Sequence, residues 1–172
     1  ENFIGAMFIG TIDAFCQKLL GDINASYRQY DILDQNGLIR FVMSRFSNLG
    51  LKHGPGYFKR IKELADAWQT ANNENISISD ICNYDSELYT LLCNLRDILS
   101  YMDFSYAVRL AVDELNQIDK KTGSEIEKYD YLFVDEYQDI NPIQEEFIKT
   151  FSSFMKMLFV VGDDDQAIYG WR

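Results

Sequence analysis

Proline, cysteine and long apolar runs are scarce in this sequence of 172 residues. Its two prolines and ten glycines provide no flexible linker or low-complexity tract that would divide the chain. The three cysteines, Cys16, Cys82 and Cys93, are odd in number and widely spaced, which favours reduced thiols over a disulfide framework or a zinc site. No segment approaches the roughly 20 apolar residues needed to cross a bilayer, and no signal peptide is recognisable. We therefore expect a cytoplasmic protein without a membrane partner.

Positive charge is also scarce. The chain has 16 Lys and Arg residues against 27 Asp and Glu residues, which gives a net charge of −11. Proteins that bind nucleic acids neutralise phosphates with a basic surface. The composition therefore argues against a nucleic-acid partner, and any DNA-binding function must come from local motifs.

Short apolar runs at residues 6–9, 131–134 and 157–161 have the character of buried strands of a parallel sheet. Between the first two, apolar residues recur at helical spacing in four stretches: 38–49, 58–68, 88–99 and 104–115. Polar and glycine-containing breaks separate these stretches at 34–37, 50–56, 72–85 and 119–124. A crossover of this length exceeds one helix. The pattern predicts an α/β fold that carries a large all-helical insertion.

The strongest chemical signal is the segment YLFVDEYQDINPIQ, which begins at Tyr131. Its apolar run delivers the adjacent carboxylates Asp135 and Glu136 to the carboxyl end of a strand, where α/β proteins bind ligands. Asp135 suits Mg²⁺, which takes few protein ligands and keeps several waters. Glu136 suits a base that accepts a proton from a water attacking a γ-phosphate. A capped helix start is predicted at Asn141, Pro142 and Gln144. The alternative is that the two carboxylates are simply exposed to solvent in a loop, as acidic residues after a strand often are.

The second signal is LFVVGDDDQAIYGWR, at residues 158–172. Gln166 offers a neutral amide that can contact a phosphate oxygen. Three side chains are of the types that stack on or clamp single-stranded nucleic acid: Tyr169, Trp171 and Arg172. The aromatic residues could also be core, and residues 163–165 could form a Ca²⁺ loop, although the glycine and distal glutamate of an EF-hand are absent.

Together the two segments resemble motifs II and III of UvrD/Rep-type superfamily 1 DNA helicases, in order and in separation. Residues 10–16 (GTIDAFC) are similar to motif Ib of that family, and residues 102–104 to a short signature ahead of motif II. The resemblance implies a partial RecA-like parallel sheet of the P-loop NTPase type. It assigns residues 1–20 and 125–172 to RecA-like domain 1A, and residues 21–124 to helical subdomain 1B and the helices that lead back to 1A.

The function implied is that of the central part of an ATP-dependent DNA helicase or translocase, moving 3′ to 5′ on single-stranded or partially duplex DNA, with ATP and Mg²⁺. By resemblance, Asp135 binds Mg²⁺, Glu136 activates water and Gln166 senses the γ-phosphate. The DNA contacts implied are Thr11, Phe15, Tyr169, Trp171 and Arg172. Gln138 and Asp139 match the family pattern and are expected to support or couple these groups.

Asp13 departs from motif Ib, where the family often has histidine. A carboxylate there would repel a phosphate, so we expect Asp13 to cap a helix or to form a hydrogen bond.

The sequence contains no phosphate-binding loop of the form GxxxxGK[ST], and the nearest match, at residues 5–11, has no lysine. The resemblance places this loop before Glu1 and a second RecA-like domain after Arg172, as partners in the same protein. We therefore expect the 172-residue chain alone to hydrolyse no ATP. One alternative is a non-catalytic helical interaction module from a decayed helicase. Another is a metal-dependent phosphoesterase that uses Asp135, Glu136 and residues 163–165.

Overall fold

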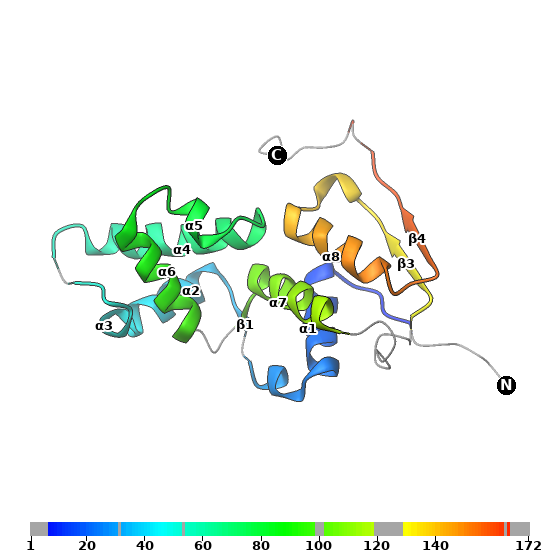
Figure 1. Ribbon diagram of the computed structural model, residues 1–172, viewed down its shortest axis with the longest axis horizontal. Coiled ribbons are helices and arrows are strands. Elements are labelled where there is room, and N and C mark those ends of the chain that lie inside the picture. The colour runs from blue at the N-terminus through cyan, green and yellow to red at the C-terminus, as the bar shows by residue number, and fades with distance from the viewer. Residues whose placement is uncertain are drawn as a thin grey trace. The chain divides into compact units, whose positions relative to one another are not determined.

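A computed structural model describes residues 7–30, 32–52, 54–98, 102–118, 129–163 and 165, with only the backbone described at 102–105. It shows a helix-rich chain with small parallel sheets (Figure 1). The chain divides into two compact units: Glu1–Arg28 with Val108–Arg172 form unit 1, and Gln29–Ala107 form unit 2. Unit 2 is therefore one continuous segment, whereas unit 1 is assembled from the segments that flank it.

Unit 2 is mostly helical. Its elements are β1 (Ile32–Leu33), α2 (Gln35–Ser44), α3 (Phe46–Leu49), α4 (Tyr57–Asn73), α5 (Ile78–Ile81), α6 (Ser86–Ile98), β2 (Met102–Asp103) and the start of α7 (Phe104–Gln117). The strands β1 and β2 form a parallel pair of two residues each. Each stretch of helical periodicity is confirmed as helix over its described residues, the first divided between α2 and α3, while residue 99 of the third lies outside the described residues.

Two predicted breaks contain helix. The first turn of α2 falls in the break at 34–37, because Asp34 Oδ1 accepts a hydrogen bond from the Gly37 amide at 2.6 Å and so caps the helix. The short helix α5 lies inside the break at 72–85, where the Ser77 side chain caps its first turn. In both places the polar residue that breaks the apolar pattern is the N-cap of the next helix.

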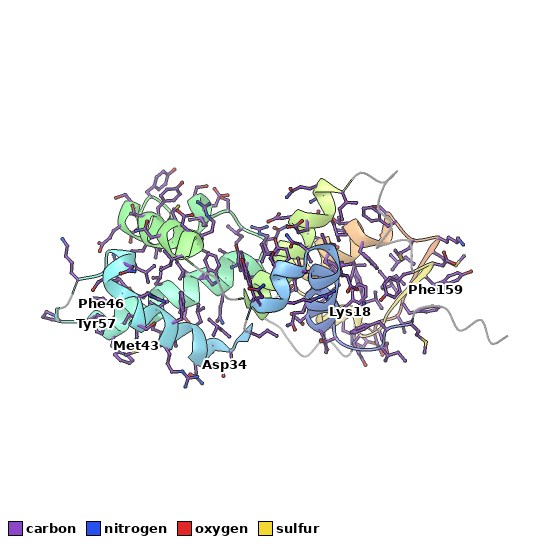
Figure 2. All side chains as sticks on the ribbon, turned by 90° about the horizontal axis from the view of Figure 1, so that it is seen from below. Lys18, Asp34, Met43, Phe46, Tyr57 and Phe159 are labelled. Atoms are coloured by element: carbon purple, nitrogen blue, oxygen red, sulfur yellow. The ribbon has the colours of Figure 1, made fainter. Side chains whose placement is uncertain are left out.

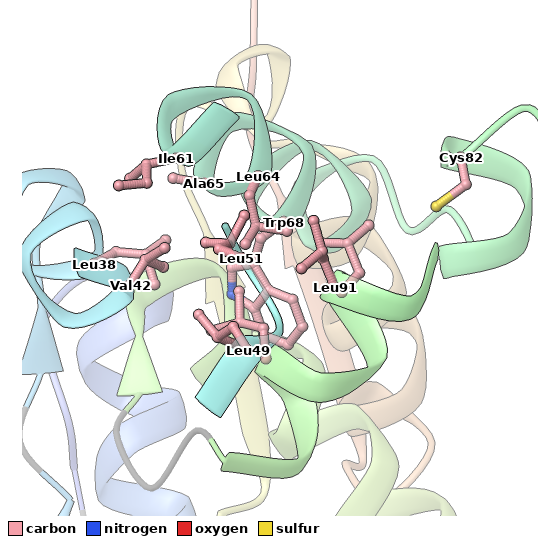
Figure 3. Packing of buried hydrophobic residues seen from close by; sticks show 12 residues of the cluster. Leu38, Val42, Leu49, Leu51, Ile61, Leu64, Ala65, Trp68, Cys82 and Leu91 are labelled. Carbon is pink, nitrogen blue, oxygen red and sulfur yellow. The ribbon is translucent and has the colours of Figure 1, made fainter. Parts of the chain in front are cut away.

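The apolar faces of these helices meet in one core (Figure 3). Its buried side chains are Leu38, Val42, Leu49, Leu51, Ile61, Leu64, Ala65, Trp68, Cys82, Leu91, Leu92 and Leu95. Beside it, Phe46 meets Tyr57 edge to face, with ring centroids 5.2 Å apart (Figure 2). Asn72 is buried, and its Nδ2 donates to the Trp68 carbonyl oxygen at 2.9 Å, as the burial of an amide requires. Unit 2 therefore has a hydrophobic core of its own.

Unit 1 holds the predicted strands at 131–134 and 157–161. Its elements are α1 (Ile12–Ile23), most of the 3₁₀ helix η1 (Ala25–Gln29), most of α7, β3 (Tyr131–Val134), the 3₁₀ helix η2 (Tyr137–Asp139), α8 (Pro142–Ser152) and β4 (Met157–Val160). β3 and β4 pair in parallel from Tyr131↔Met157 to Val134↔Val160. The helix α8 connects them, so both strands end at the same edge of the sheet, as the sequence predicted for these two runs.

The strand predicted at residues 6–9 is wrong for residues 7–9, and Ala6 lies outside the described residues. Met7 and Ile9 are 73% and 85% exposed, and the ring of Phe8 packs on Phe15 with centroids 5.1 Å apart. A strand is held by ladder hydrogen bonds to a neighbour. Within the described part of the chain, β3 and β4 pair only with each other, and residues 7–9 join no ladder.

The prediction that the strands are buried is also wrong for much of this sheet. All four residues of β4 are exposed, and Phe133 is 71% exposed with its ring stacked on Phe159 at 4.6 Å. Val134, in contrast, is buried. The apolar side chains of these strands are therefore only partly covered by the other described residues. None of the described helices is both long and apolar enough to span a lipid bilayer.

Candidate functional site

The acidic pair stands directly after β3, and both carboxylate residues are exposed. Asp135 Oδ1 accepts a hydrogen bond from the Glu136 amide at 3.0 Å. Glu136 itself adopts the left-handed conformation, with φ 52° and ψ 44°. This conformation costs a residue other than glycine about 1–2 kcal/mol. Strain of this kind is concentrated at functional sites, so the turn at Glu136 supports a functional role for this end of β3.

The segments that follow β3 and β4 are joined by hydrogen bonds. The Tyr137 amide donates to the Val161 carbonyl oxygen at 3.0 Å. Gln138 Nε2 donates to Glu136 Oε2 at 2.5 Å, and Gln138 Oε1 accepts from the Asp163 amide at 3.0 Å. The carboxylate of Glu136 is thereby connected to the backbone that leaves β4.

Gly162 allows this close approach. A Cβ atom at that position would lie 2.8 Å from Gln138 Oε1 and 3.3 Å from the Tyr137 backbone nitrogen. Separations below about 3.0 Å are not tolerated without a shift of the neighbour. The prediction from sequence named Gly162 only as the end of a strand. A glycine directly after a strand is a recognised signal for a close backbone approach.

The carboxylate of Asp135 fits a magnesium ion better than it fits a closed metal cage. Within the described residues, no group of three or more His, Cys, Asp or Glu side chains is arranged to hold a metal. Mg²⁺ takes one or two carboxylates and completes its octahedron with waters and substrate phosphates. A two-metal phosphoesterase needs a larger cluster of ligands. Asp135, Glu136, Asp163 and Asp165 do not form one, and Asp164 lies outside the described residues.

Thr11 and Phe15 both stabilise α1. Thr11 is its N-cap, with Oγ1 accepting a hydrogen bond from the Ala14 amide at 3.2 Å. The ring of Phe15 packs at centroid distances between 5.1 and 6.2 Å against four other rings, those of Phe8, Tyr129, Phe147 and Phe151. These contacts anchor α1 in unit 1. Contact of either side chain with DNA stays a prediction.

Asp13 lies in the first turn of α1, and its Oδ2 accepts a hydrogen bond from Gln144 Nε2 at 3.4 Å. Its predicted hydrogen-bonding role is confirmed, while the cap itself is Thr11. Gln144 also completes the predicted capping box of α8. Its backbone N–H donates to Asn141 Oδ1, and its side-chain Oε1 accepts from the Asn141 backbone N–H. Burial raises the pKa of the Asp13 carboxyl above its ordinary value.

Asp13→Asn is expected to raise the melting temperature of the chain at pH 7. Because the pKa of Asp13 is raised in the folded state, its ionised form destabilises the fold above that pKa. This cost disappears as pH falls below the ordinary pKa of aspartate. The gain from the amide should therefore vanish by about pH 3, below the ordinary value of ~3.9. Each kcal/mol gained corresponds to about 2–4 °C in thermal unfolding of a domain of this size.

Asp97→Asn is the matched control, because it removes the same charge from a side chain that is 66% exposed. An equal gain in both variants would show that relief of the net negative charge, rather than burial of Asp13, is responsible.

Four of the predicted site residues lie outside the described residues: Gln166, Tyr169, Trp171 and Arg172. Of the predicted site residues that are described, Asp135, Glu136 and Gln138 lie together at the end of β3. Thr11 and Phe15 lie elsewhere in unit 1, at the start of α1.

The whole chain, residues 1–172, matches the family model described as the UvrD/REP helicase N-terminal domain. The chain belongs to this family. It is 37% identical to the ATP-dependent DNA helicase PcrA of Staphylococcus epidermidis over 186 aligned positions, which cover 100% of this chain and 25% of the relative. It is 27% identical to PcrA of Staphylococcus aureus, covering 96% of this chain and 24% of the relative. Identity is also 27% to the ATP-dependent DNA helicase Rep of Buchnera aphidicola, covering 88% and 22%.

The predicted resemblance is thus confirmed at the level of the family. This member spans about a quarter of the length of the curated relatives that it matches.

Proposed function

We propose that the protein containing this chain is an ATP-dependent DNA helicase or translocase that moves 3′ to 5′, and that the chain supplies the central part of its motor. The observation that carries the proposal is the end of β3, where Asp135 and a strained Glu136 stand side by side and are joined through Gln138 to the end of β4. The relatives named ATP-dependent DNA helicase Rep and PcrA support the same activity.

In this function Asp135 holds Mg²⁺ and Glu136 accepts a proton from the water that attacks the γ-phosphate. Bound Mg²⁺ supplies charge neutralisation at the phosphates of ATP. Gln166 contacts the γ-phosphate and reports the nucleotide state. The residues proposed to contact DNA are Thr11, Phe15, Tyr169, Trp171 and Arg172.

The architecture proposed for the chain is RecA-like. Residues 1–20 and 125–172 form part of domain 1A, and residues 21–124 form helical subdomain 1B with the helices that lead back. The parallel β3–α8–β4 crossover and the separate core of unit 2 support two parts of this kind, although the compact units divide at residues 28/29 and 107/108. The exposed apolar residues of β3 and β4 further suggest that other parts of the whole protein, including a segment with the phosphate-binding loop, cover this sheet.

A non-catalytic helical interaction module is the alternative, and the independent core of unit 2 is compatible with it. The site at the end of β3 favours the enzyme, since adjacent carboxylates at the carboxyl end of a strand suit Mg²⁺ binding and proton transfer beside a phosphate.

The test is ATP hydrolysis by the full-length protein, with and without single-stranded DNA, together with unwinding of duplexes that carry a 3′ or a 5′ tail. We expect Mg²⁺-dependent hydrolysis that DNA stimulates, and unwinding from the 3′ tail. The 172-residue chain alone should hydrolyse no ATP, because it has no GxxxxGK[ST] loop. Absence of hydrolysis by the full-length protein would favour the interaction module, and unwinding only from a 5′ tail would overturn the proposed direction.

A further inference from the structure

We propose that Gln138 is a positioning residue, which holds the carboxylate of Glu136 in place and couples it to the segment that follows β4. This inference rests on the proposed function, because it takes Glu136 as the base of ATP hydrolysis. It goes beyond that function by assigning the link between the base and the end of the neighbouring strand to one side chain.

Two contacts of Gln138 together require an amide side chain. The Glu136 carboxylate only accepts hydrogen bonds, and its Oε2 lies 2.5 Å from Gln138 Nε2. The Asp163 backbone amide only donates, and its nitrogen lies 3.0 Å from Gln138 Oε1. A side chain at position 138 must therefore donate at one end and accept at the other. The reversed amide would place oxygen against a carboxylate and nitrogen against an N–H group, so the partners fix its orientation.

The bridge joins positions that are far apart in sequence, since Gln138 and Asp163 are separated by 25 residues. The backbone around it is tightly held. The Tyr137 amide donates to the Val161 carbonyl oxygen at 3.0 Å, and Gly162 leaves no room for a side chain beside Gln138. A movement of the backbone at Asp163 therefore reaches Glu136 directly through Gln138.

A glutamate side chain has three rotatable bonds, and Glu136 is exposed. Without a fixed partner its carboxylate would sample many positions. A hydrogen bond to an ionised group is among the stronger ones in proteins, so the amide of Gln138 selects one position. Misplacement of a catalytic group by about 1 Å costs on the order of 10²-fold in rate. Loss of the bridge should therefore slow hydrolysis without removing the base.

The segment that begins at Asp163 carries Gln166 and the proposed DNA contacts Tyr169, Trp171 and Arg172. Because Gln138 contacts the first backbone amide of this segment, it offers a route by which DNA binding changes the position of Glu136. Stimulation of hydrolysis by DNA should then depend on Gln138. A residue that only stabilises the fold would not alter the ratio of stimulated to unstimulated rate.

The experiment compares Gln138→Met and Gln138→Glu in the full-length protein. Methionine keeps the length of the side chain and loses both hydrogen bonds. Glutamate retains an acceptor for the Asp163 amide, but places an oxygen against Glu136. Gln117→Met is the matched control, because the hydrogen bond that Gln117 donates within the described residues goes to the Asp113 carbonyl oxygen of its own helix. The readouts are kcat and KM for ATP with and without single-stranded DNA, and the melting temperature.

We expect kcat with DNA to fall about 10–100-fold in both Gln138 variants, with KM for ATP changed less than about 3-fold and DNA stimulation reduced. Gln138→Met places no charge beside Glu136, so its melting temperature should fall less than that of Gln138→Glu, whose carboxylate repels that of Glu136. Wild-type kinetics in both variants would overturn the inference. So would a loss of activity that follows a fall in melting temperature in both, with the DNA stimulation ratio unchanged. If the wild-type protein itself hydrolyses no ATP, the proposed function fails, and that result is distinct from a failure of the bridge.

Discussion

Glu136→Gln is expected to lower DNA-stimulated ATP hydrolysis by the full-length protein about 10²–10⁴-fold, the range that a general base contributes. The glutamine amide has the shape of the carboxylate but accepts no proton. Its oxygen still accepts the hydrogen bond from Gln138, so the turn after β3 should be preserved. Affinity for ATP should stay within a few-fold of wild type. Phosphate release measures the rate, and nucleotide titration measures the affinity.

Glu146→Gln is the matched control, because it removes the same charge from α8 in the same unit. Its rate should equal that of the wild type. Unchanged hydrolysis in Glu136→Gln would contradict the assignment of Glu136 as the base. A parallel loss of ATP affinity would show that Glu136 acts in binding rather than in the proton transfer.

The sequence predicts well those elements whose formation depends on residues close together in the chain. The strand at Tyr131–Val134 is a short apolar run closed by two carboxylates, and the helix that follows begins with an asparagine, a proline and a glutamine three residues after the cap. Each of these signals acts over a few residues. The parallel pairing of β3 and β4 also follows, because a helix between two apolar strands returns the chain in the same direction.

The features that the sequence did not predict depend on partners distant in the chain. Residues 7–9 are apolar enough for a strand, but a strand forms only against a neighbour. The left-handed backbone of Glu136 has no signature in composition, since this conformation is expected of glycine or asparagine. The bridge of Gln138 needs the end of β4 to lie against the turn after β3, and no spacing of residues reveals that. The resemblance indicated a coupling role for Gln138 without naming what it contacts.

Phe147→Ala is expected to destabilise unit 1 by about 3–5 kcal/mol, the usual cost of removing a buried phenylalanine. The ring is 2% exposed, stacks on Phe151 with centroids 5.6 Å apart and meets Phe15 at 6.2 Å. It therefore holds both α1 and the helix that connects β3 to β4. Hydrogen exchange of the full-length protein, followed peptide by peptide, should show the loss of protection in α1, α8 and β3.

Phe58→Ala is the matched control, because this ring lies on α4 of unit 2 and is 62% exposed. Its cost should stay within about 0.5 kcal/mol. Because unit 2 has a separate core, the amides of α4 and α6 should keep their protection in Phe147→Ala. Equal costs for the two variants would mean that the Phe147 cluster does not anchor unit 1. A loss of protection in α4 and α6 as large as that in α8 would mean that the two units unfold as one, in which case the site at the end of β3 would depend on the helical unit for its stability.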